Sequence, residues 1–235
     1  AKNDLALRAK LGIGPDDFVI GKVARLFEHK GHFDLIAATT LLARQHPKVK
    51  LLLLGDGNLR VPLEALVRGG PGAELLHGRV IFAGLVRPEE VPGYIGIMDA
   101  VAHLSHREGL ARVLPQALAA GKPIVAYDCD GAREVCVDNE TGFLVLGKLE
   151  AIPDDLLPDQ MPALMDSLTA REYGKLRSNP IETVAHRLRE LITKPELRTR
   201  FGTRGRELVK EQFPVQRMVD ELHALYLRLQ AEVRR

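Results

Sequence analysis

Short apolar runs alternate with helix-like patterns along the chain from residue 18 onward. One run, Val49–Leu54, is almost continuously apolar, which is typical of a strand covered on both faces. Turn-forming and charged residues separate the runs from one another. The strands that this pattern predicts are Phe18–Ala24, Val49–Leu54, Val80–Ala83, Ala100–Leu104, Ile124–Tyr127 and a shorter one at Gly142–Leu146.

Helical patterns fill the spaces between these runs, with apolar residues at the spacing of one helix face. The helix after the fourth predicted strand is rich in Ala and Leu, begins near Ala111 and ends at Gly121 and Pro123. Such alternation predicts an α/β fold, a Rossmann-like doubly wound parallel sheet with further helices at the C-terminus. The other helices predicted here are Phe33–Arg44, Leu59–Val67 and Pro88–Ile97, the last with proline at its start.

The regular alternation ends near Gly147. Residues 148–181 contain four prolines and no sustained period, so we predict an irregular insertion or lid there. Helices are predicted again over Glu182–Ile192 and Pro195–Gln212, and a last helix over residues 214–234. We treat residues 1–235 as a single domain. The last helix carries an apolar stripe made of Met218, Val219, Leu222, Leu225, Tyr226, Leu229 and Val233.

The composition is that of an ordinary globular protein, with 46% hydrophobic and 27% charged residues. The formal net charge is +2 and the basic residues form no long run, so nucleic acid is not an expected partner. No apolar stretch reaches the roughly 20 residues that span a bilayer, and we expect no signal peptide. With only two cysteines, Cys129 and Cys136, we expect reduced thiols and a cytoplasmic location.

The loop after the predicted strand Ala100–Leu104 holds Glu108 and Gly109 just before a helix. In open α/β sheets, ligands bind at the carboxyl ends of strands, where the free N–H groups of a helix start suit phosphate oxygens. Glu108 is therefore a candidate to bind sugar hydroxyls or stabilise positive charge, or else it favours the helix start. Arg112 either adds charge to this site or lies on the first helical turn. Gln116 either offers its amide to a diol or is a solvated surface residue.

A second candidate segment, Gly-Lys-Val-Ala-Arg-Leu-Phe-Glu-His-Lys-Gly, follows the first predicted strand. It places Arg25 and Lys30 beyond the carboxyl end of that strand, with Gly31 before the next helix. Two cations at this position can pair with a diphosphate, and arginine can do so in a bidentate manner. Either residue alone is as easily a solvated surface cation. The Glu108 loop at another strand end of the same sheet favours the binding role.

Other motifs at the strand ends indicate less. Gly55-Asp56-Gly57 lacks the Gly-x-Gly-x-x-Gly spacing of a dinucleotide site and predicts a turn, with Asp56 or Asn58 capping the next helix. Residues 103–106 contain two histidines and a serine. They do not form the Gly-x-Ser-x-Gly motif of a serine hydrolase, and two histidines are too few for a metal site. We therefore predict no metal site and no cofactor.

Taken together, these segments resemble one family. The chain is similar to the C-terminal, donor-binding domain of a GT-B glycosyltransferase, in the retaining group called glycosyl transferases group 1 (glycosyltransferase family 4). The similarity covers nearly everything except about residues 148–181. The segments that carry it are 21–31, 51–57, 80–85, 108–135, 139–145, 195–198 and the final helix.

The resemblance implies roles for the matching residues. Arg25 and Lys30 would hold the nucleotide diphosphate, and Glu108 would be the catalytic first acid of the family's Glu-x7-Glu motif, in contact with the donor sugar. Gln116 occupies the place of the second acid, which binds ribose hydroxyls, and keeps hydrogen-bonding capacity without the charge. The other positions implied at the nucleotide site are Gly109, Leu110, Ala111, Arg112, Val113 and, at the base edge, Leu85.

By the same resemblance, the full-length enzyme would be a metal-independent hexosyltransferase that moves a sugar from UDP-sugar or GDP-sugar to an acceptor with retention. A GT-B active site lies between two domains, and this chain supplies only one. We expect the isolated domain, without its N-terminal acceptor domain, to bind nucleotide weakly and to be inactive. The apolar stripe of the last helix favours a homodimer, and peripheral membrane association of the full-length protein stays open.

Two alternatives keep the fold and change the function. One is a sugar-nucleotide epimerase of the same architecture, which would need further acid and base groups in the cleft. The other is a non-catalytic domain in which Gln116 marks a degenerate site and the helix stripe makes protein contacts.

Overall fold

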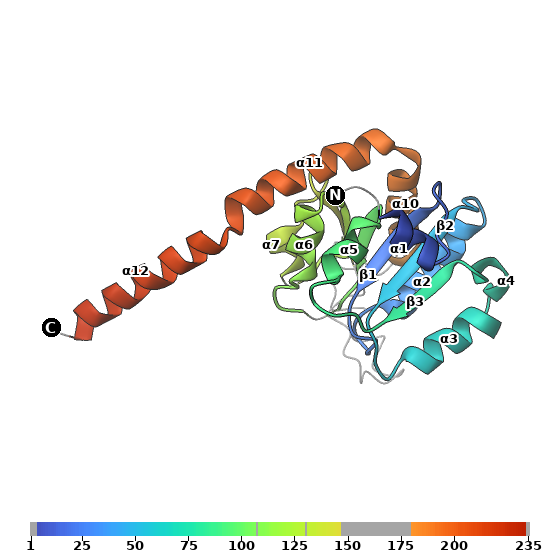
Figure 1. Ribbon diagram of the computed structural model, residues 1–235, viewed down its shortest axis with the longest axis horizontal. Coiled ribbons are helices and arrows are strands. Elements are labelled where there is room, and N and C mark those ends of the chain that lie inside the picture. The colour runs from blue at the N-terminus through green and yellow to red at the C-terminus, as the bar shows by residue number, and fades with distance from the viewer. Residues whose placement is uncertain (1–3, 107, 130, 147–179, 234–235) are drawn as a thin grey trace, which may run out of the picture.

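The sheet contains the six predicted strands, and every pair of neighbouring strands is parallel. The computed structural model describes residues 4–106, 108–129, 131–146 and 180–233, and Figure 1 shows their arrangement. The strand order is β3-β2-β1-β4-β5-β6, so the predicted Rossmann-like fold is confirmed. The strands are β1 (Phe18–Val23), β2 (Val49–Leu54), β3 (Val80–Gly84), β4 (Ala100–His103), β5 (Ile124–Tyr127) and β6 (Gly142–Val145).

The strand order reverses between β1 and β4, which lie side by side at the centre of the sheet. The register pairs Ile20 with Ala100 and Gly21 with Val101. If this register continues for two more residues, His103 of β4 lies beside Val23 of β1. The loops that follow β1 and β4 therefore leave the sheet next to each other, at the point where open α/β sheets bind ligands.

Helices cover both faces of the sheet (Figure 1). One face is covered by α2 and α10 and the other by α5 and α6. α11 runs along the edge near β6 and contributes buried residues to the cores on both faces of the sheet. The helices are α1 (Leu5–Lys10), α2 (His32–Ala43), α3 (Arg60–Gly69), α4 (Ala73–Leu76), α5 (Val91–Gly96), α6 (Val113–Ala119), α7 (Ala132–Val135), α10 (Pro180–Thr193), α11 (Pro195–Gln212) and α12 (Val215–Val233).

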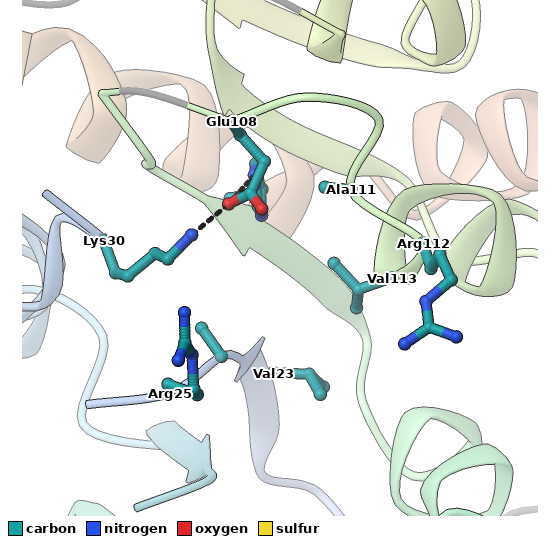
Figure 2. A pocket seen from close by; sticks show the side chains of 9 residues that line it. Val23, Arg25, Lys30, Glu108, Ala111, Arg112 and Val113 are labelled. Atoms are coloured by element: carbon teal, nitrogen blue, oxygen red, sulfur yellow. Dashed lines mark hydrogen bonds and ion pairs between the residues drawn. The ribbon is translucent and has the colours of Figure 1, made fainter. Parts of the chain in front are cut away.

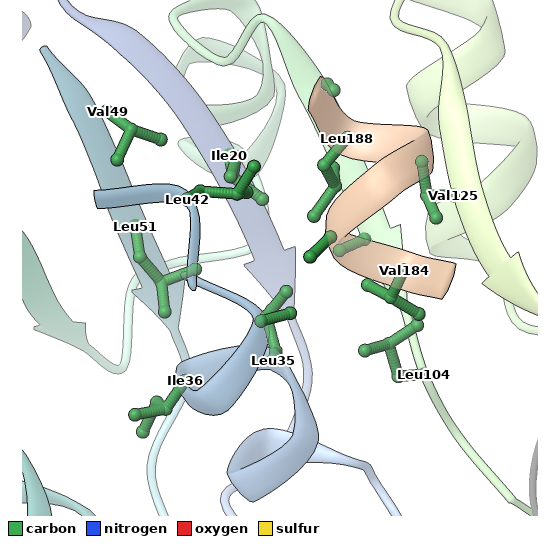
Figure 3. Packing of buried hydrophobic residues seen from close by; sticks show 14 of the residues in the cluster. Ile20, Leu35, Ile36, Leu42, Val49, Leu51, Leu104, Val125, Val184 and Leu188 are labelled. Atoms are coloured by element: carbon green, nitrogen blue, oxygen red, sulfur yellow. The ribbon is translucent and has the colours of Figure 1, made fainter. Parts of the chain in front are cut away.

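Alternation along β1 divides its side chains between two cores. Ile20 belongs to the core beneath α2 and α10, shown in Figure 3, whereas Val19 belongs to the core beneath α5 and α6. Gly21 faces the second core, where an added Cβ would lie 1.9 Å from the Met98 sulfur. By the same alternation Lys22 points to the α2 face, together with Ile20.

The last helix, α12, extends away from the rest of the molecule (Figure 1). Its apolar stripe is exposed: Met218 is 56%, Leu222 45% and Leu225 38% accessible. Across the described part of the chain, no helix combines the length and the apolar character needed to cross a membrane. The predicted insertion at 148–181 lies outside the described residues except for its last two positions, which begin α10.

Several predicted helix boundaries were wrong. α6 begins at Val113 rather than near Ala111, and α5 begins at Val91 because hydrogen-bonded turns occupy the residues from Arg87 onward. Neither Asp56 nor Asn58 caps α3: the first accepts the Gly57 N–H, and the second binds a distant carboxylate. Among the described helices, α1, α4 and α7 were not predicted; they are only four to six residues long, too short for a periodic signal.

Candidate functional site

A pocket lies at the carboxyl ends of β1 and β4 (Figure 2). Its walls come from two units of the fold, the segment after β1 and the segment from β4 to the start of α6. It combines basic, acidic and small apolar side chains. The residues that line it are Val23, Ala24, Arg25, Lys30, His103, Glu108, Ala111, Arg112 and Val113.

Glu108 and Lys30 form an ion pair across the mouth of this pocket (Figure 2). The Glu108 Oε2 atom accepts hydrogen bonds from the Lys30 Nζ and from the Ser105 hydroxyl, the latter at 3.1 Å. Partial burial opposes ionisation of the carboxyl, but the Lys30 ammonium and the Ser105 hydroxyl outweigh it and hold the pKa of Glu108 below its ordinary value. Glu108 is therefore a carboxylate at neutral pH.

Backbone contacts tie the Lys30 loop to the Glu108 loop. The His106 N–H donates to the His29 carbonyl at 2.8 Å, and the Ser105 Oγ lies 3.2 Å from the same carbonyl oxygen. Gly31 is needed where the loops touch, because its φ is +67° and an added Cβ would lie 1.9 Å from the Leu104 carbonyl oxygen. The two loops therefore hold their charged side chains in a fixed relation.

A hydrogen-bonded cluster supports these loops from the side of α2. The Tyr127 hydroxyl, at the end of β5, donates to the Asp34 carboxylate at 2.6 Å. Nε2 of His106 lies 3.4 Å from the same carboxylate oxygen. Burial and the neighbouring carboxylate raise the pKa of Tyr127, so its hydroxyl keeps its proton and remains a donor. Asp34 thus connects α2, β5 and the loop that leads to Glu108.

Two buried basic side chains, Lys22 and His32, lie close to the pocket, and a third, His103, lines it. Burial lowers the pKa of Lys22 to about 7, with a further contribution from Lys30, and lowers the pKa of His32 to about 4 and of His103 to about 3. His32 bonds the Arg25 carbonyl through Nε2 at 2.9 Å. Nε2 of His103 lies 3.8 Å from Glu108. Both histidines are therefore neutral at pH 7.

The structure brings together most of the residues that the sequence and the family resemblance had singled out. Arg25, Lys30 and Glu108 line one pocket, and Ala111, Arg112 and Val113 line it too. Gly109, Leu110, Leu85 and Gln116 do not, and Leu85 is 78% exposed. Because α6 begins at Val113, Gly109, Leu110 and Ala111 lie in the loop before the helix rather than on its first turn.

Sequence reasoning missed Lys22, His32 and the role of His103 as a pocket wall. A signal for Lys22 was present, because it is the one charged residue in the otherwise apolar strand Phe18–Val23. His103 was considered only as a nucleophile partner or metal ligand. Among the described residues, no three His, Cys, Asp or Glu side chains gather closely enough to hold a metal ion.

Comparisons with known proteins agree on one family. The family model described as glycosyl transferases group 1 matches residues 3–155. The GDP-mannose-dependent alpha-(1-6)-phosphatidylinositol monomannoside mannosyltransferase of Mycolicibacterium smegmatis is 30% identical over 198 residues, which cover 80% of this chain and 50% of that protein. The chain spans about half the length of the curated relatives it matches.

Solved structures share the fold. Anabaena HepE, crystallised with UDP and glucose, superimposes with a TM-score of 0.69 at 24% identity, over 93% of this chain and 51% of that one. The C-terminal domain of LpcC, a glycosyl transferase group 1 family protein from Francisella tularensis, superimposes with a TM-score of 0.67 at 20% identity. That match covers 92% of this chain and 95% of the LpcC domain. A solved C-terminal domain thus corresponds to this chain along almost its whole length.

Proposed function

This chain belongs to the glycosyl transferases group 1 family, and from that premise we propose that its pocket binds the diphosphate and sugar of a nucleotide-sugar donor. In the full-length protein, the bound donor would give its sugar to an acceptor with retention at the anomeric carbon. The relative from Mycolicibacterium smegmatis is named for GDP-mannose and HepE was crystallised with UDP and glucose, which supports a UDP-sugar or GDP-sugar as donor.

One observation carries this proposal: Arg25, Lys30, Arg112 and Glu108 meet in one pocket although they come from separate βα units. Three cations and one carboxylate give the pocket a formal excess of two positive charges. Two esterified phosphates carry about two negative charges at neutral pH, so a nucleotide sugar would neutralise that excess. A solvated surface role for these cations offers no reason for their convergence at the switch point.

The charges also suggest how each group acts during transfer. Arg25 and Lys30 would stabilise the negative charge that develops on the departing nucleoside diphosphate, which is the main electrostatic contribution in this mechanism. Once Lys30 turns to phosphate, the Glu108 carboxylate is released from the ion pair. Glu108 would then orient the sugar hydroxyls and stabilise positive charge at the anomeric carbon.

The donor site needs partners that lie outside this chain. We propose that an N-terminal domain supplies the acceptor site and that the isolated chain binds nucleotide but transfers nothing. The cations of the pocket would replace a metal ion in neutralising the diphosphate. Nucleotide affinity should therefore be the same in EDTA and in magnesium.

Calorimetric titration with UDP, GDP, UDP-glucose and GDP-mannose tests the proposal. The substitution Lys30→Ala should weaken binding by about 1–3 kcal/mol, the range for losing a charge-assisted hydrogen bond. Lys48→Ala is the matched control, since Lys48 pairs with Asp16 on the surface at the opposite edge of the sheet. Its affinity should equal that of the unaltered protein.

Two results would contradict the proposal. If none of the four ligands binds, or if Lys30→Ala leaves every affinity unchanged, the pocket is not a diphosphate site. For the full-length protein, incubation with the donor and no acceptor separates transfer from epimerisation. A new sugar-nucleotide epimer would show that the chemistry is not glycosyl transfer.

A further inference from the structure

Lys22 is a buried base for which the proposed mechanism has no role. It lies in β1, is 1% accessible, and ranks among the largest fully buried side chains of the described residues. Its Nζ atom is buried and has no hydrogen-bond partner among the described residues. Most buried polar atoms have a partner, so an unpartnered lysine nitrogen calls for a physical explanation.

Charged and titratable groups face Lys22 from the elements packed around it. The loop after β1 contributes Lys30, the first turn of α2 contributes His32 and Asp34, and the β4 segment contributes His103 and Glu108. Both carboxylates already have partners: Glu108 is paired with Lys30, and Asp34 accepts from Tyr127. Lys22 therefore lies close to the binding pocket without a carboxylate of its own.

Burial and the neighbouring charges determine whether Lys22 is protonated in the ligand-free protein. A fully buried ammonium without a hydrogen-bonded counterion is strongly destabilised, and the group instead loses its proton. The nearby Lys30 ammonium adds repulsion. Burial and this repulsion lower the pKa of Lys22 to about 7, so the amine is largely neutral in mildly alkaline solution.

A bound diphosphate changes this balance. It brings two to three negative charges into the pocket and draws the Lys30 ammonium away from Glu108. Both changes favour a positive charge at Lys22, because an anion has arrived and a carboxylate has lost its cation. Resting on the proposed function, we infer that Lys22 takes up one proton from solvent when a nucleoside diphosphate binds, so that the –NH2 group becomes –NH3⁺ and adds a further cation to the donor site.

Proton uptake by Lys22 would make nucleotide affinity depend on pH in a defined way. Above about pH 7.5 the ligand phosphates are fully ionised, since a terminal phosphate loses its second proton near pH 6. Binding that requires one proton should then weaken up to about tenfold for each pH unit between 7.5 and 9. A lysine on the surface keeps its charge through this range and gives no such dependence.

The test measures the protons taken up on binding of UDP to the whole chain. Calorimetry at pH 8 in buffers of different ionisation enthalpy gives that number directly. We expect an uptake close to one proton for the unaltered protein and near zero for Lys22→Met. Lys122→Met is the matched control, because Lys122 is partly buried and also has a lowered pKa, but it donates to the Gly96 carbonyl at the amino edge of the sheet.

Binding of UDP without proton uptake would overturn the inferred role of Lys22 and leave the proposed function intact. Uptake that persists in Lys22→Met would also overturn it and assign the proton to another group, with His103→Gln and His32→Gln as the next variants. If Lys22→Met fails to fold, the pH dependence of UDP affinity in the unaltered protein decides alone. Absence of any nucleotide binding would remove the proposed function and the inference together.

Discussion

Two buried basic side chains at opposite edges of the same sheet have different hydrogen-bonding surroundings. At the amino edge, Arg8 of α1 is 3% accessible and donates to the carbonyls of Ile97, Gly14 and Asp17 at 3.0, 2.9 and 2.6 Å. At the carboxyl edge, Lys22 is equally buried, and its nitrogen has no hydrogen-bond partner in the described part of the chain.

The comparison separates a side chain that holds the fold together, Arg8, from one that lies beside the pocket, Lys22. Arg8 closes the loops before β1 and β4: both terminal nitrogens of its guanidinium donate to carbonyls that the fold supplies, while its Nε has no hydrogen-bond partner among the described residues. Lys22 lies near the point where the loops after β1 and β4 form the pocket, and the described residues supply its nitrogen with no acceptor. A buried basic group whose charged end donates to backbone carbonyls stabilises the fold, whereas we expect one without such an acceptor, beside a pocket, to serve ligand binding.

Removing Arg8 should have the largest effect on stability. Arg8→Met removes three hydrogen bonds to backbone carbonyls, of which the Gly14 carbonyl still accepts from the Asp17 N–H, and we expect a loss of about 3–5 kcal/mol in the free energy of unfolding. Urea denaturation measures this loss, with Arg87→Met as a control at an exposed arginine that pairs with Glu90 on the surface. A loss below that of an ordinary surface substitution would show that Arg8 does not hold this edge together.

Removing Lys22 should change the free energy of unfolding in the opposite direction. Lys22→Met replaces an unpartnered amine by an apolar chain of similar length, and we expect a gain of about 1–4 kcal/mol at pH 7. In the unaltered protein the pKa of Lys22 is lower in the folded state, about 7, than in the unfolded chain. Between those two pKa values the unfolded state binds more protons, so stability rises with pH and is lost again as pH falls toward 7.

The difference in stability between the two proteins should therefore depend on pH. The advantage of Lys22→Met over the unaltered protein should shrink as pH increases from 7 to 10, when read by urea denaturation at each pH. A constant difference between the two proteins would contradict a neutral buried amine. A loss of stability on substitution would contradict the unsatisfied state itself.

A smaller effect is expected where the site loops are braced. Tyr127→Phe removes one hydrogen bond to Asp34, which keeps its contact with His106, and should lower stability by about 1 kcal/mol. UDP affinity, measured by calorimetry, should fall slightly if the bond helps to position the Glu108 loop. Stability equal to that of the unaltered protein would show that solvent replaces the bond without loss.

The smallest effect concerns the ion pair over the pocket. Glu108→Gln frees Lys30 in the ligand-free protein, so UDP should bind more tightly by about 0.5 kcal/mol, the range of a partly exposed pair. Calorimetry with UDP and with the sugar donor checks both parts, because affinity for the sugar donor should not gain equally. Weaker UDP binding would contradict competition between Glu108 and the diphosphate for Lys30.

Local patterns in the sequence were sufficient for the order and type of the main elements. The apolar runs located all six strands, since a strand buried on both faces must be apolar nearly throughout. Placement of Arg25, Lys30 and Glu108 at strand ends also followed from sequence, because a parallel sheet brings all carboxyl ends to one edge. Helix starts were less predictable: α6 begins at Val113, and Ala111 and Arg112, which precede it, line the pocket.

Only the tertiary structure decided which strand ends are neighbours and what lies beneath them. The adjacency of β1 and β4 joins the Lys30 loop to the Glu108 loop, and this pairing spans 78 residues of sequence. Lys22 is 1% accessible, and the groups near it include His32 of α2 and His103 of β4. The sequence by itself determined which residues carry charge, whereas the packing decided their surroundings and, through desolvation, whether a side chain such as Lys22 keeps its proton.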